Sequence, residues 1–317
     1  AAAPWPALAA AVAGALVLVL PRGIPGRPVA AACLLPLLAW PVPRPPPGSL
    51  WLTLLDVGQG LAVVVRTRHH TLVYDAGPRY GATLDAGGAV VAPFLRHAGR
   101  HRVDTLVLSH AQADHVGGAA TLLETIAVER VIGDAPGLPA ASVPCVAGQS
   151  WRWDGVAFHL LHPLRDSAHT GNDASCVVLV VAADGSRVLL PGDIEVAAER
   201  ELVARAAARL AAGVLVVPHH GSRTSSSDPF LDAVQARLAL LAVGYRNRHE
   251  HPDGGVVRRL RARGIAVYDT ASAGAIEVRA DARGVMRIHR LERVAARGIW
   301  RAASAQQRAR LGRGTGH

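Results

Sequence analysis

The sequence predicts an α/β fold in which helices cover β-sheets to form a layered sandwich. Half of the 317 residues are hydrophobic, so a chain of this length can bury a large core. Short apolar runs typical of strands recur throughout residues 50–290, and helical stretches lie between them from residue 88 onward. Sheets with interspersed helices bury their apolar faces by packing helices against them. We therefore expect one α/β domain over residues 50–290.

An apolar part, residues 1–43, precedes this domain. Its first 21 residues contain no charged side chain, and a second uncharged stretch covers residues 28–43. About 20 apolar residues cross a bilayer as a helix, so the first stretch is predicted to be a transmembrane helix. The second stretch is short and interrupted by Pro36, which makes it a weaker candidate. A signal peptide is not expected, because no basic region precedes the first stretch.

The charges between the two stretches indicate an orientation. Arg22 and Arg27 favour a cytoplasmic hairpin, which would place the soluble part on the outer side of the membrane.

The sequence begins Ala-Ala-Ala-Pro without an initiator Met, so we expect a fragment of a longer protein. Residues 41–48 are rich in Pro, which excludes a helix or a central strand, so a linker is predicted at 44–49. Residues 291–317 are predicted to be a basic, partly disordered tail.

Each element of the domain is predicted from its hydrophobic pattern. Three β-rich runs come first, and the Gly and His turns between them are typical of hairpins. These runs cover residues 50–57, 61–66 and 71–75. Helices are predicted at 88–98, 117–124, 194–211, 228–236 and 254–263. Further strands are predicted at 103–108, 127–132, 156–161, 175–182, 187–191, 213–217, 238–243, 265–268, 274–279 and 284–289.

Charge and cysteine content limit the classes of partner and compartment. The formal net charge is +10 and all 34 basic residues are Arg, which favours an anionic partner such as nucleic acid or a membrane surface. Because Ala is also abundant, biased codon usage explains a generally basic surface equally well.

The three cysteines are too few for a disulfide framework. Only Cys145 and Cys176 could pair, and the sequence leaves that pairing open.

Residue types that bind metals follow three of the predicted strands. The segment 109–118 comes after strand 103–108, and its Gly117-Gly118 pair is expected to open a helix. Imidazole and carboxylate groups displayed at strand ends suit zinc or manganese. On a single loop such residues are as often solvated polar groups, but three strand ends of this kind in one chain favour a metal site. The residues concerned are His110, Gln112, Asp114, His115, Asp193, His219 and His220.

As a set, the motifs of this chain resemble those of the ComEC family of DNA-uptake channels. They are Leu55-Asp56-Val57-Gly58-Gln59-Gly60, Tyr74-Asp75-Ala76-Gly77, the segment 109–118, Asn172-Asp173-Ala174-Ser175, Pro191-Gly192-Asp193, His219-His220-Gly221-Ser222 and His251-Pro252. The resemblance implies a four-layer αββα metallo-β-lactamase fold behind a multi-pass channel in the bacterial inner (cytoplasmic) membrane. It also implies DNA as a partner, other competence proteins that deliver it, and a metal-dependent nuclease acting on the incoming DNA.

The same resemblance implies a set of metal ligands. One metal would take Asp114, His115 and either His219 or His220, with Asp193 as a bridge. The other would take His110, Gln112 and Asn172. Two metals about 3.5–4 Å apart would clamp a phosphodiester and activate a water. In such an enzyme Asp114, Asp193 and His110 are the expected catalytic residues.

Two neutral side chains depart from the pattern that the resemblance implies. Gln112 stands where the family usually has Asp, and Asn172 where hydrolytic relatives usually have His. A neutral amide oxygen is a poorer ligand for a divalent cation than a carboxylate. We therefore predict one firmly held manganese or zinc ion and one weak site. A catalytically weak module that guides DNA around a structural metal is the alternative, and a hydrolase of small phosphoesters or thioesters is a third.

Further residues are predicted to surround the metals, where they would support the ligands or contact the substrate. Asp75 is a candidate partner for a ligand histidine, although an Asp in a turn before Gly77 explains it equally well. Arg246 is a candidate contact for a nucleic-acid backbone, and an exposed Arg needs no such role. The complete predicted set is Asp56, Gln59, Asp75, Asp173, Ser222, Arg246 and His251.

Overall fold

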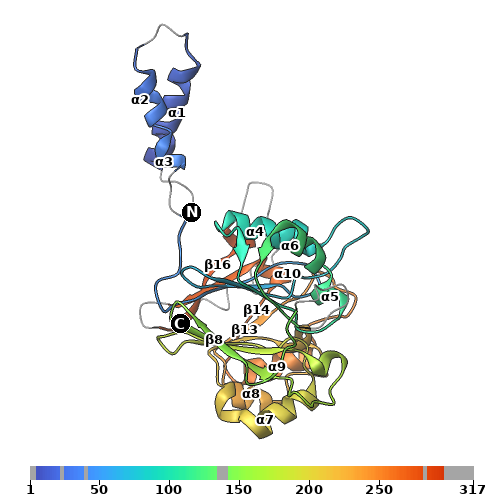
Figure 1. The fold of residues 1–317 in the computed structure, drawn as a ribbon. Helices are drawn as coiled ribbons and strands as arrows, with labels where there is room; N and C mark the ends of the chain where they lie inside the picture. The colour runs from blue at the N-terminus through green and yellow to red at the C-terminus, as the bar shows by residue number, and fades with distance from the viewer. Residues whose placement is uncertain (1–4, 22–24, 39–41, 134–141, 281–283, 296–317) are drawn as a thin grey trace. The chain divides into compact units, whose positions relative to one another are not determined.

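A computed structural model describes residues 5–21, 25–38, 42–133, 142–280 and 284–295. The chain divides into two compact units, Ala1–Arg44 and Pro45–His317, which are drawn in Figure 1. This division lies inside the predicted linker. Of the predicted tail 291–317, the first residues are ordered, since β16 ends at Leu291 and α11 covers Glu292–Ala295. Residues 296–317 and Arg22 lie outside the described residues, so the predictions made for them are not tested.

The described residues of the first unit form three helices, α1 (Trp5–Val19), α2 (Arg27–Ala32) and α3 (Leu35–Leu38). Gly14 allows α1 and α2 to pack closely, because a Cβ atom there would lie 2.4 Å from the carbonyl oxygen of Ala30. Helix α1 has 15 residues. Among the described residues, no helix combines the length and apolar character needed to cross a membrane. The predicted membrane span therefore stays a prediction.

The second unit contains two seven-stranded sheets. In the first sheet the order is β16-β15-β1-β2-β3-β5-β7, and in the second it is β14-β13-β12-β11-β10-β9-β8. The first sheet contains β1 (Trp51–Leu54), β2 (Val63–Arg66), β3 (Thr71–Tyr74), β5 (Thr105–Val107), β7 (Val131–Ile132), β15 (Ile276–Ala280) and β16 (Met286–Leu291). The second contains β8 (Ser150–Trp153), β9 (Val156–His162), β10 (Val177–Val181), β11 (Arg187–Leu190), β12 (Val214–Val216), β13 (Leu238–Leu241) and β14 (Ala266–Asp269).

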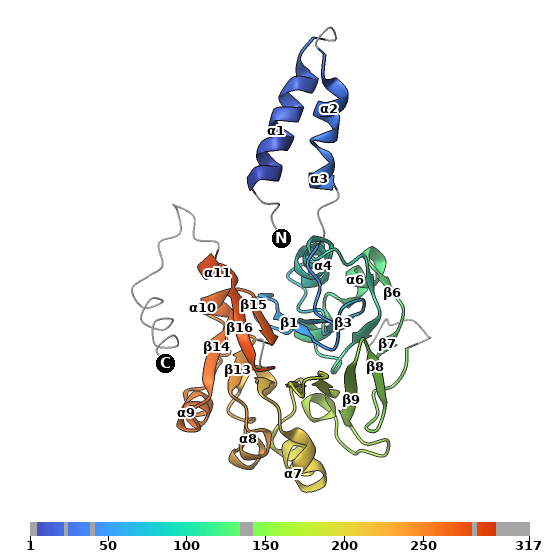
Figure 2. The ribbon, with the colours of Figure 1, turned by 90° about the vertical axis from the view of Figure 1, so that its left-hand side faces the viewer.

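Helices cover the outer face of each sheet, so the unit has the predicted αββα layers (Figures 1 and 2). On the first sheet lie the π-helical turn η1 (Gly87–Val91), α4 (Ala92–His97) and α6 (Ala119–Thr125). On the second sheet lie α7 (Val196–Leu210), α8 (Asp228–Val234) and α9 (Gly254–Ala262). Short elements complete the fold, namely β4 (Arg102–Val103), α5 (Ala113–Val116), β6 (Ala127–Val128), η2 (Gly171–Ala174), η3 (Pro218–Gly221) and α10 (Thr270–Ala273).

Alternating side chains of each central strand enter two different cores. In β11, Val188 and Leu190 pack between the sheets, whereas Leu189 packs under the outer helices. A strand that is buried on both faces must be apolar throughout, which explains the continuous Val and Leu runs in the sequence. The two sheets are thus joined by one apolar layer, and each sheet has a second apolar layer beneath its helices.

The helices on the first sheet approach each other through glycines. A Cβ atom at Gly87 would lie 1.9 Å from the carbonyl oxygen of Gly118, which is far inside contact distance. A Cβ atom at Gly118 would lie 2.3 Å from the backbone nitrogen of Gly87. Each glycine therefore leaves room for the backbone of the other, and η1 can lie against the start of α6.

At one edge the two sheets are joined by a polar contact between turns. Asp154, in the turn between β8 and β9, accepts hydrogen bonds from the Thr67 hydroxyl at 2.6 Å and the His69 backbone N–H at 2.7 Å. Its carboxylate also lies 2.9 Å from Nδ1 of His69 and 3.2 Å from Nδ1 of His70. The backbone carbonyl of Asp154 accepts a hydrogen bond from Gly48, at the end of the linker. The turns between β2 and β3 and between β8 and β9 are thus held together.

Three details differ from the predicted elements. The strands predicted at 103–108 and 127–132 are each split in two, and β4 pairs with β6 outside both large sheets. Strand β8 was not predicted, because its polar and aromatic residues alternate over only four positions at a sheet edge. The segment 109–118 is not a single loop, since α5 begins at Ala113 and carries Asp114 and His115.

Candidate metal centre

The predicted ligands come from loops at the carboxyl ends of neighbouring strands. Strands β3 and β5 are parallel, as are β11 and β12, so the residues that follow them meet along one edge of the sandwich. Asp75 follows β3, Ser109 and His110 follow β5, and Asp193 follows β11. The His219-His220 pair follows β12 inside η3. Both of these histidines have left-handed φ angles, 49° and 55°, which turn the chain sharply at this point.

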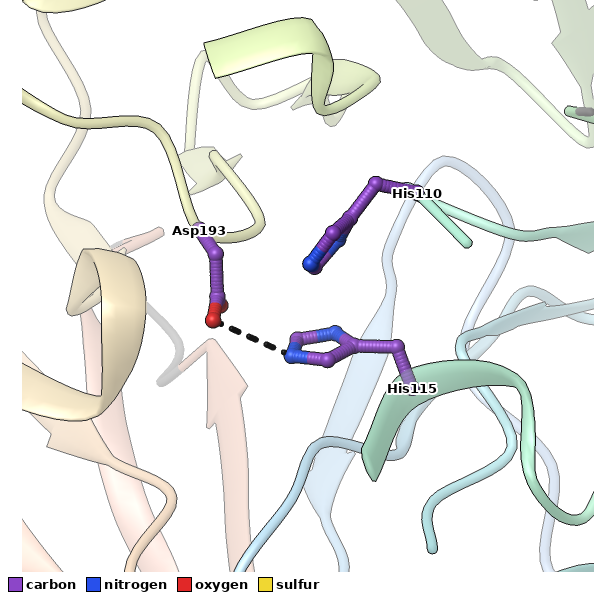
Figure 3. Close-up of side chains that lie close together, drawn as sticks. All are labelled: His110, His115 and Asp193. Carbon is purple, nitrogen blue, oxygen red and sulfur yellow. Dashed lines mark ion pairs between the residues drawn. The ribbon is translucent and has the colours of Figure 1, made fainter. Parts of the chain in front are cut away.

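Two overlapping groups of side chains converge at this edge. His110, His115 and Asp193 form one group and are all buried (Figure 3). Asp114, His115 and His220 form the other. Within each group the potential ligand atoms lie within 4.8 Å of one another. The Nε2 atom of His115 lies 3.2 Å from a carboxylate oxygen of Asp193. The Nε2 atom of His220 lies 3.3 Å from a carboxylate oxygen of Asp114 and 3.5 Å from one of Asp193.

Hydrogen bonds on the opposite ring nitrogens fix the two inner histidines. Nδ1 of His115 lies 2.8 Å from the Asp75 carboxylate, which also accepts hydrogen bonds from the backbone and hydroxyl of Ser109. Nδ1 of His220 lies 2.8 Å from the carbonyl oxygen of Ala242. In each ring Nε2 therefore faces the centre. This is how ligand histidines are commonly oriented at metal sites.

Several buried polar atoms at the centre have no hydrogen-bond partner among the described residues. They are Nε2 of His110, His115 and His220 and both carboxylate oxygens of Asp193. A buried polar group without a partner costs about 1–3 kcal/mol, more when it is charged. Five such atoms in one place are accounted for if a cation binds between them. The donor set, imidazole nitrogens with carboxylate oxygens, fits a divalent transition metal.

The carboxyl groups and imidazoles of the candidate centre shift one another's pKa values. Burial disfavours the Asp193 carboxylate, yet His115 and His220 hold its pKa well below the ordinary value. Burial also opposes the charge of Asp114, but the adjacent His220 and the charge of His115 bring its pKa to about 2. Burial disfavours a charged His115, but Asp193 and Asp75 raise its pKa well above the ordinary value. Burial, with His115 nearby, lowers the pKa of His110.

Beside these groups, neutral side chains form a hydrogen-bonded network. The Gln112 amide donates a hydrogen bond to the side-chain oxygen of Asn172. The Asn172 amide donates in turn to Glu195 at 3.1 Å and lies 3.4 Å from Nε2 of His219. Nδ1 of His219 lies 3.1 Å from the same carboxylate, and the hydroxyl of Thr224 donates to it at 3.0 Å. Gln112 and Asn172 are thus brought together as expected, but their amides are engaged with each other.

The structure distinguishes between the two adjacent histidines, which the sequence alone did not. His220 is 3% exposed and has its Nε2 among the buried ligand atoms. The side chain of His219 is 19% exposed, and its Nε2 lies 3.9 Å from the Asp193 carboxylate. Glu195, which pairs with His219, was missed by the sequence analysis. Its only signal is its place two residues after Asp193 in the Pro-Gly-Asp-Ile-Glu segment.

The surrounding residues divide into those that support the centre and those at its rim. Asp75 is the buried partner of His115, as described above. Asp173 accepts hydrogen bonds from the backbone of Glu195 and Ala198, so it caps the start of α7 instead of facing the ligands. Ser222 hydrogen-bonds with Thr224. His251 has its ring centroid 5.9 Å from that of His219.

The remaining predicted residues hold the rim loops in place. Asp56 accepts a hydrogen bond from Arg293 at 2.7 Å and a longer one from the backbone of Gly58. Gln59 accepts a hydrogen bond from the backbone of Gly244 at 3.2 Å. Arg246 has its guanidinium over the ring of Tyr245.

The cysteine pairing that the sequence left open is formed. Cys145 and Cys176 make a disulfide with a sequence separation of 31 residues. Cys176 is fully buried at the start of β10, and its backbone N–H donates to the carbonyl oxygen of Ser109. The disulfide therefore ties the segment before β8 to the strand that begins beside the candidate centre.

Comparisons with known proteins match this chain along most of its length. A model of the metallo-beta-lactamase superfamily matches residues 55–245. Competence protein ComA of Neisseria gonorrhoeae is 39% identical over 277 residues, covering 87% of this chain and 39% of that protein. ComE operon protein 3 of Bacillus subtilis is 30% identical over 253 residues, covering 71% of this chain and 32% of that protein. The chain thus spans between about a third and two fifths of the length of these relatives.

A solved structure with a related fold is Igni18, a metallo hydrolase from Ignicoccus hospitalis. It is 14% identical to this chain and aligns with a TM-score of 0.46, covering 72% of this chain and 98% of its own length.

Proposed function

Because this chain belongs to the metallo-β-lactamase superfamily and, within it, to the ComEC family of competence proteins, we propose that it acts in DNA uptake during natural transformation. In this proposal the second unit is a metal-dependent phosphodiesterase that cleaves incoming DNA. The observation that carries the proposal is the set of five buried, unpartnered ligand atoms on His110, His115, Asp193 and His220.

We assign one metal to the side chains with the most favourable geometry. Asp114, His115 and His220 would hold a manganese or zinc ion together with Asp193, whose carboxylate lies between the two histidines. Asp75 and the Ala242 carbonyl keep the two imidazoles directed at the ion. His110 is adjacent and would contact either this ion or a second one. The choice of His220 over His219 follows from its burial and its distance to Asp114.

A second metal position would be weak. Its remaining ligands are Gln112 and Asn172, whose amides bond to each other in place of presenting two oxygens to one point. The side-chain nitrogen of Asn172 also donates a hydrogen bond to Glu195. A weak second metal position favours the alternative function as well. In that alternative the unit guides DNA, and its single metal stabilises the fold.

In the catalytic proposal, a bound divalent cation would act as a Lewis acid and lower the pKa of a water coordinated to it. The residues around this cation would balance its charge and position the substrate. Asp193 and Asp114 are ionised at neutral pH, since their pKa values are lowered, and so supply negative charge that balances the cation. His219 lies at the rim with its Nδ1 held by Glu195, where its Nε2 would contact a phosphate oxygen of the substrate.

The disulfide supports a location outside the cytoplasm. Structural disulfides persist in oxidising compartments and are rare in the reducing cytosol. The Cys145–Cys176 bridge is therefore consistent with a domain on the outer face of the inner membrane, as Arg22 and Arg27 indicate. There the domain would receive DNA from other competence proteins before transfer through a multi-pass channel.

The test is a joint measurement of metal content and DNA cleavage. The full chain, purified in detergent, is loaded with manganese or zinc and assayed on single- and double-stranded DNA. We expect one tightly held ion per chain and cleavage that is lost in His115→Ala and Asp193→Ala. His101→Ala, which removes an exposed histidine outside the predicted ligand set, is the matched control. Unchanged metal content in His115→Ala and Asp193→Ala would overturn the assignment. One bound ion without cleavage would favour the DNA-guiding alternative.

The weak second position gives a prediction of its own. The double variant Gln112→Asp and Asn172→His restores a carboxylate and an imidazole, which are better ligands than two amides. We expect the metal stoichiometry to rise from one to two per chain and cleavage to increase. Elemental analysis after gel filtration measures the stoichiometry. If the wild-type chain already holds two ions tightly, the one-metal interpretation is wrong.

A further inference from the structure

The loop 244–252, beside the metal centre, carries an unusually exposed aromatic side chain. Tyr245 is 66% exposed, more than any other large apolar side chain described in the second unit. A tyrosine in water gives up the stabilisation of burial, which amounts to about 25 cal/mol for each Å² of apolar surface. The position of Tyr245 is therefore not explained by the stability of the fold, and its ring is accessible to a ligand.

Hydrogen bonds of one side chain brace this loop. The Asn247 amide donates to the carbonyl oxygens of Gly244 at 3.1 Å and His251 at 2.7 Å. Its side-chain oxygen accepts from the backbone N–H of His251 at 2.9 Å. Because Asn247 bonds to both Gly244 and His251, it restrains the backbone that carries Tyr245 and Arg246. A ligand would not need to order the loop, which lowers the entropic cost of binding.

Both ends of the loop are attached to the candidate metal centre. At one end the backbone of Gly244 bonds to Gln59, in the turn that also touches α5 through the Leu61 N–H and Asp114 carbonyl. At the other end the backbone of Asp253 donates to the carbonyl oxygen of Gly221, which follows His220. The His251 and His220 ring centroids are 6.5 Å apart. Both ends of the loop that carries Tyr245 are thus bonded to segments next to the candidate ligands.

The charges around Tyr245 favour an anionic ligand with a flat apolar part. The guanidinium of Arg246 lies 5.3 Å from the centre of the tyrosine ring. Arg248 belongs to the same loop and bonds to His249, and Glu250 is the single acidic residue between Gly244 and Pro252. An exposed aromatic ring beside arginines is the arrangement by which proteins stack a base and hold the phosphates next to it. In a duplex the base faces are covered by their neighbours, so this arrangement selects an unpaired base.

We propose that Tyr245 stacks on an unpaired base of single-stranded nucleic acid while Arg246 and Arg248 contact its phosphates. This inference rests on the proposed function, because it assumes that a polynucleotide reaches the adjacent metal centre. It adds that the strand is single at this point and that it is held by stacking, without sequence readout.

The test compares binding of two strands of equal charge by the metal-loaded full chain in detergent. One is a fluorescein-labelled oligothymidylate of about 12 nucleotides, within the site size of single-strand binders. The other is an abasic strand of the same length. We expect Tyr245→Ala to weaken oligothymidylate binding about tenfold, which is a typical loss for one stacked base, and to leave the abasic strand unaffected. Recovered oligonucleotides are checked by gel to confirm that they are intact.

Two further variants separate stacking from apolar contact. Tyr245→Phe keeps the ring and is expected to retain the affinity, whereas Tyr245→Leu keeps apolar surface without a ring and is expected to behave like Tyr245→Ala. Arg248→Ala should weaken both strands and reduce the salt dependence of binding, since it removes a phosphate contact. Equal losses for both strands in Tyr245→Ala, full affinity in Tyr245→Leu, or equally tight binding of a duplex would each overturn the proposal.

A small substrate distinguishes failure of this inference from failure of the proposed function. Hydrolysis of bis(4-nitrophenyl) phosphate by the wild-type chain reports on the metal centre without a polynucleotide. If this hydrolysis occurs but oligothymidylate binding does not depend on Tyr245, only the stacking inference falls. If hydrolysis is absent and Tyr245-dependent binding remains, the inference stands and the unit is a DNA-guiding module.

Discussion

At the scale of single residues, Asp75 shows how a side chain outside the candidate ligand set shapes the candidate metal centre. It is fully buried and has a left-handed φ of 59°, so it lies in a sharp turn after β3. Its carboxylate accepts hydrogen bonds from the backbone and hydroxyl of Ser109 and pairs with Nδ1 of His115. Asp75 thus lies in a turn, as one interpretation from the sequence had it, and it also pairs with a candidate ligand histidine, as the other predicted.

Replacing Asp75 tests this orienting role. In Asp75→Asn the neutral side chain no longer balances or fixes the His115 imidazole. We expect metal affinity to fall about 10–100-fold, the usual effect of losing such a partner, with the protein still folded. Titration of the loaded chain with a competing chelator measures the affinity.

The control for Asp75→Asn is Asp85→Asn. Asp85 is also buried, and it accepts hydrogen bonds from the Gly88 backbone and the Thr121 hydroxyl, remote from the ligands. Its replacement should leave metal affinity unchanged. Equal losses in the two variants would show that Asp75 acts through general stability and not through His115.

The candidate ligand residues could be brought together from the sequence because the loops that carry them follow apolar strands. What could not be predicted was the choice between His219 and His220. The two are adjacent in a turn of left-handed residues, and only the tertiary positions of Ala242 and Glu195 direct one ring inward and the other to the rim. Glu195 itself was missed because a Glu before a helix has an ordinary explanation in the first turn.

At the scale of elements, the periodicity of apolar residues was sufficient to predict most strands and helices. It failed where tertiary pairing decides the outcome. The run 103–108 is continuous in the sequence, yet β4 and β5 pair with different partners on either side of Asp104. Strand β8 was overlooked because an edge strand buries only one face. Its Trp151 packs on Phe158 while Ser150 and Arg152 are exposed.

The disulfide gives a prediction about the elements that it joins. Closing a loop of 31 residues restricts the unfolded chain, which stabilises the folded state by about 3–4 kcal/mol in the chain-entropy model. Reduction should therefore lower the free energy of unfolding by about this amount. Urea unfolding of the oxidised and reduced chain, both carrying Cys33→Ser to prevent exchange, measures the difference.

The variant Cys145→Ser with Cys176→Ser is the control for this experiment. It should be as unstable as the reduced chain and insensitive to dithiothreitol. If reduction left the unfolding curve of the wild type unchanged, the bridge would contribute nothing to stability under those conditions.

At the scale of the whole molecule, the contacts of Asp154 connect the two sheets and make their association sensitive to acid. Burial opposes the charge of this carboxylate, but hydrogen bonds from Thr67 and from the backbone and ring of His69 outweigh it and lower its pKa. A carboxyl group with a lowered pKa in the folded state stabilises the protein above its unfolded pKa, about 3.9. That stabilisation is lost as the pH falls through the folded pKa.

Asp154→Asn should consequently destabilise the domain at neutral pH and matter little in acid. Charged hydrogen bonds are worth about 1.5–3 kcal/mol, and we expect a loss of this order at pH 7. An Asn tolerates the left-handed φ of 49° at this position, so the backbone is not strained. Urea unfolding at a series of pH values should show the two proteins converging below pH about 4.

Asp166→Asn, at an exposed position, is the control and should leave stability unchanged at every pH. A constant difference between wild type and Asp154→Asn down to pH about 2 would mean that the ionised carboxylate is not what holds the turns together.

The glycines at positions 87 and 118 have a consequence for how this protein can change over time. Each leaves room for the backbone of the other, at 1.9 Å and 2.3 Å from where a Cβ atom would lie. A mutation to alanine at either position would force η1 and the start of α6 apart, and no second mutation at the partner glycine could relieve the clash. Neither glycine can therefore be replaced by a series of single mutations that each leave this contact intact.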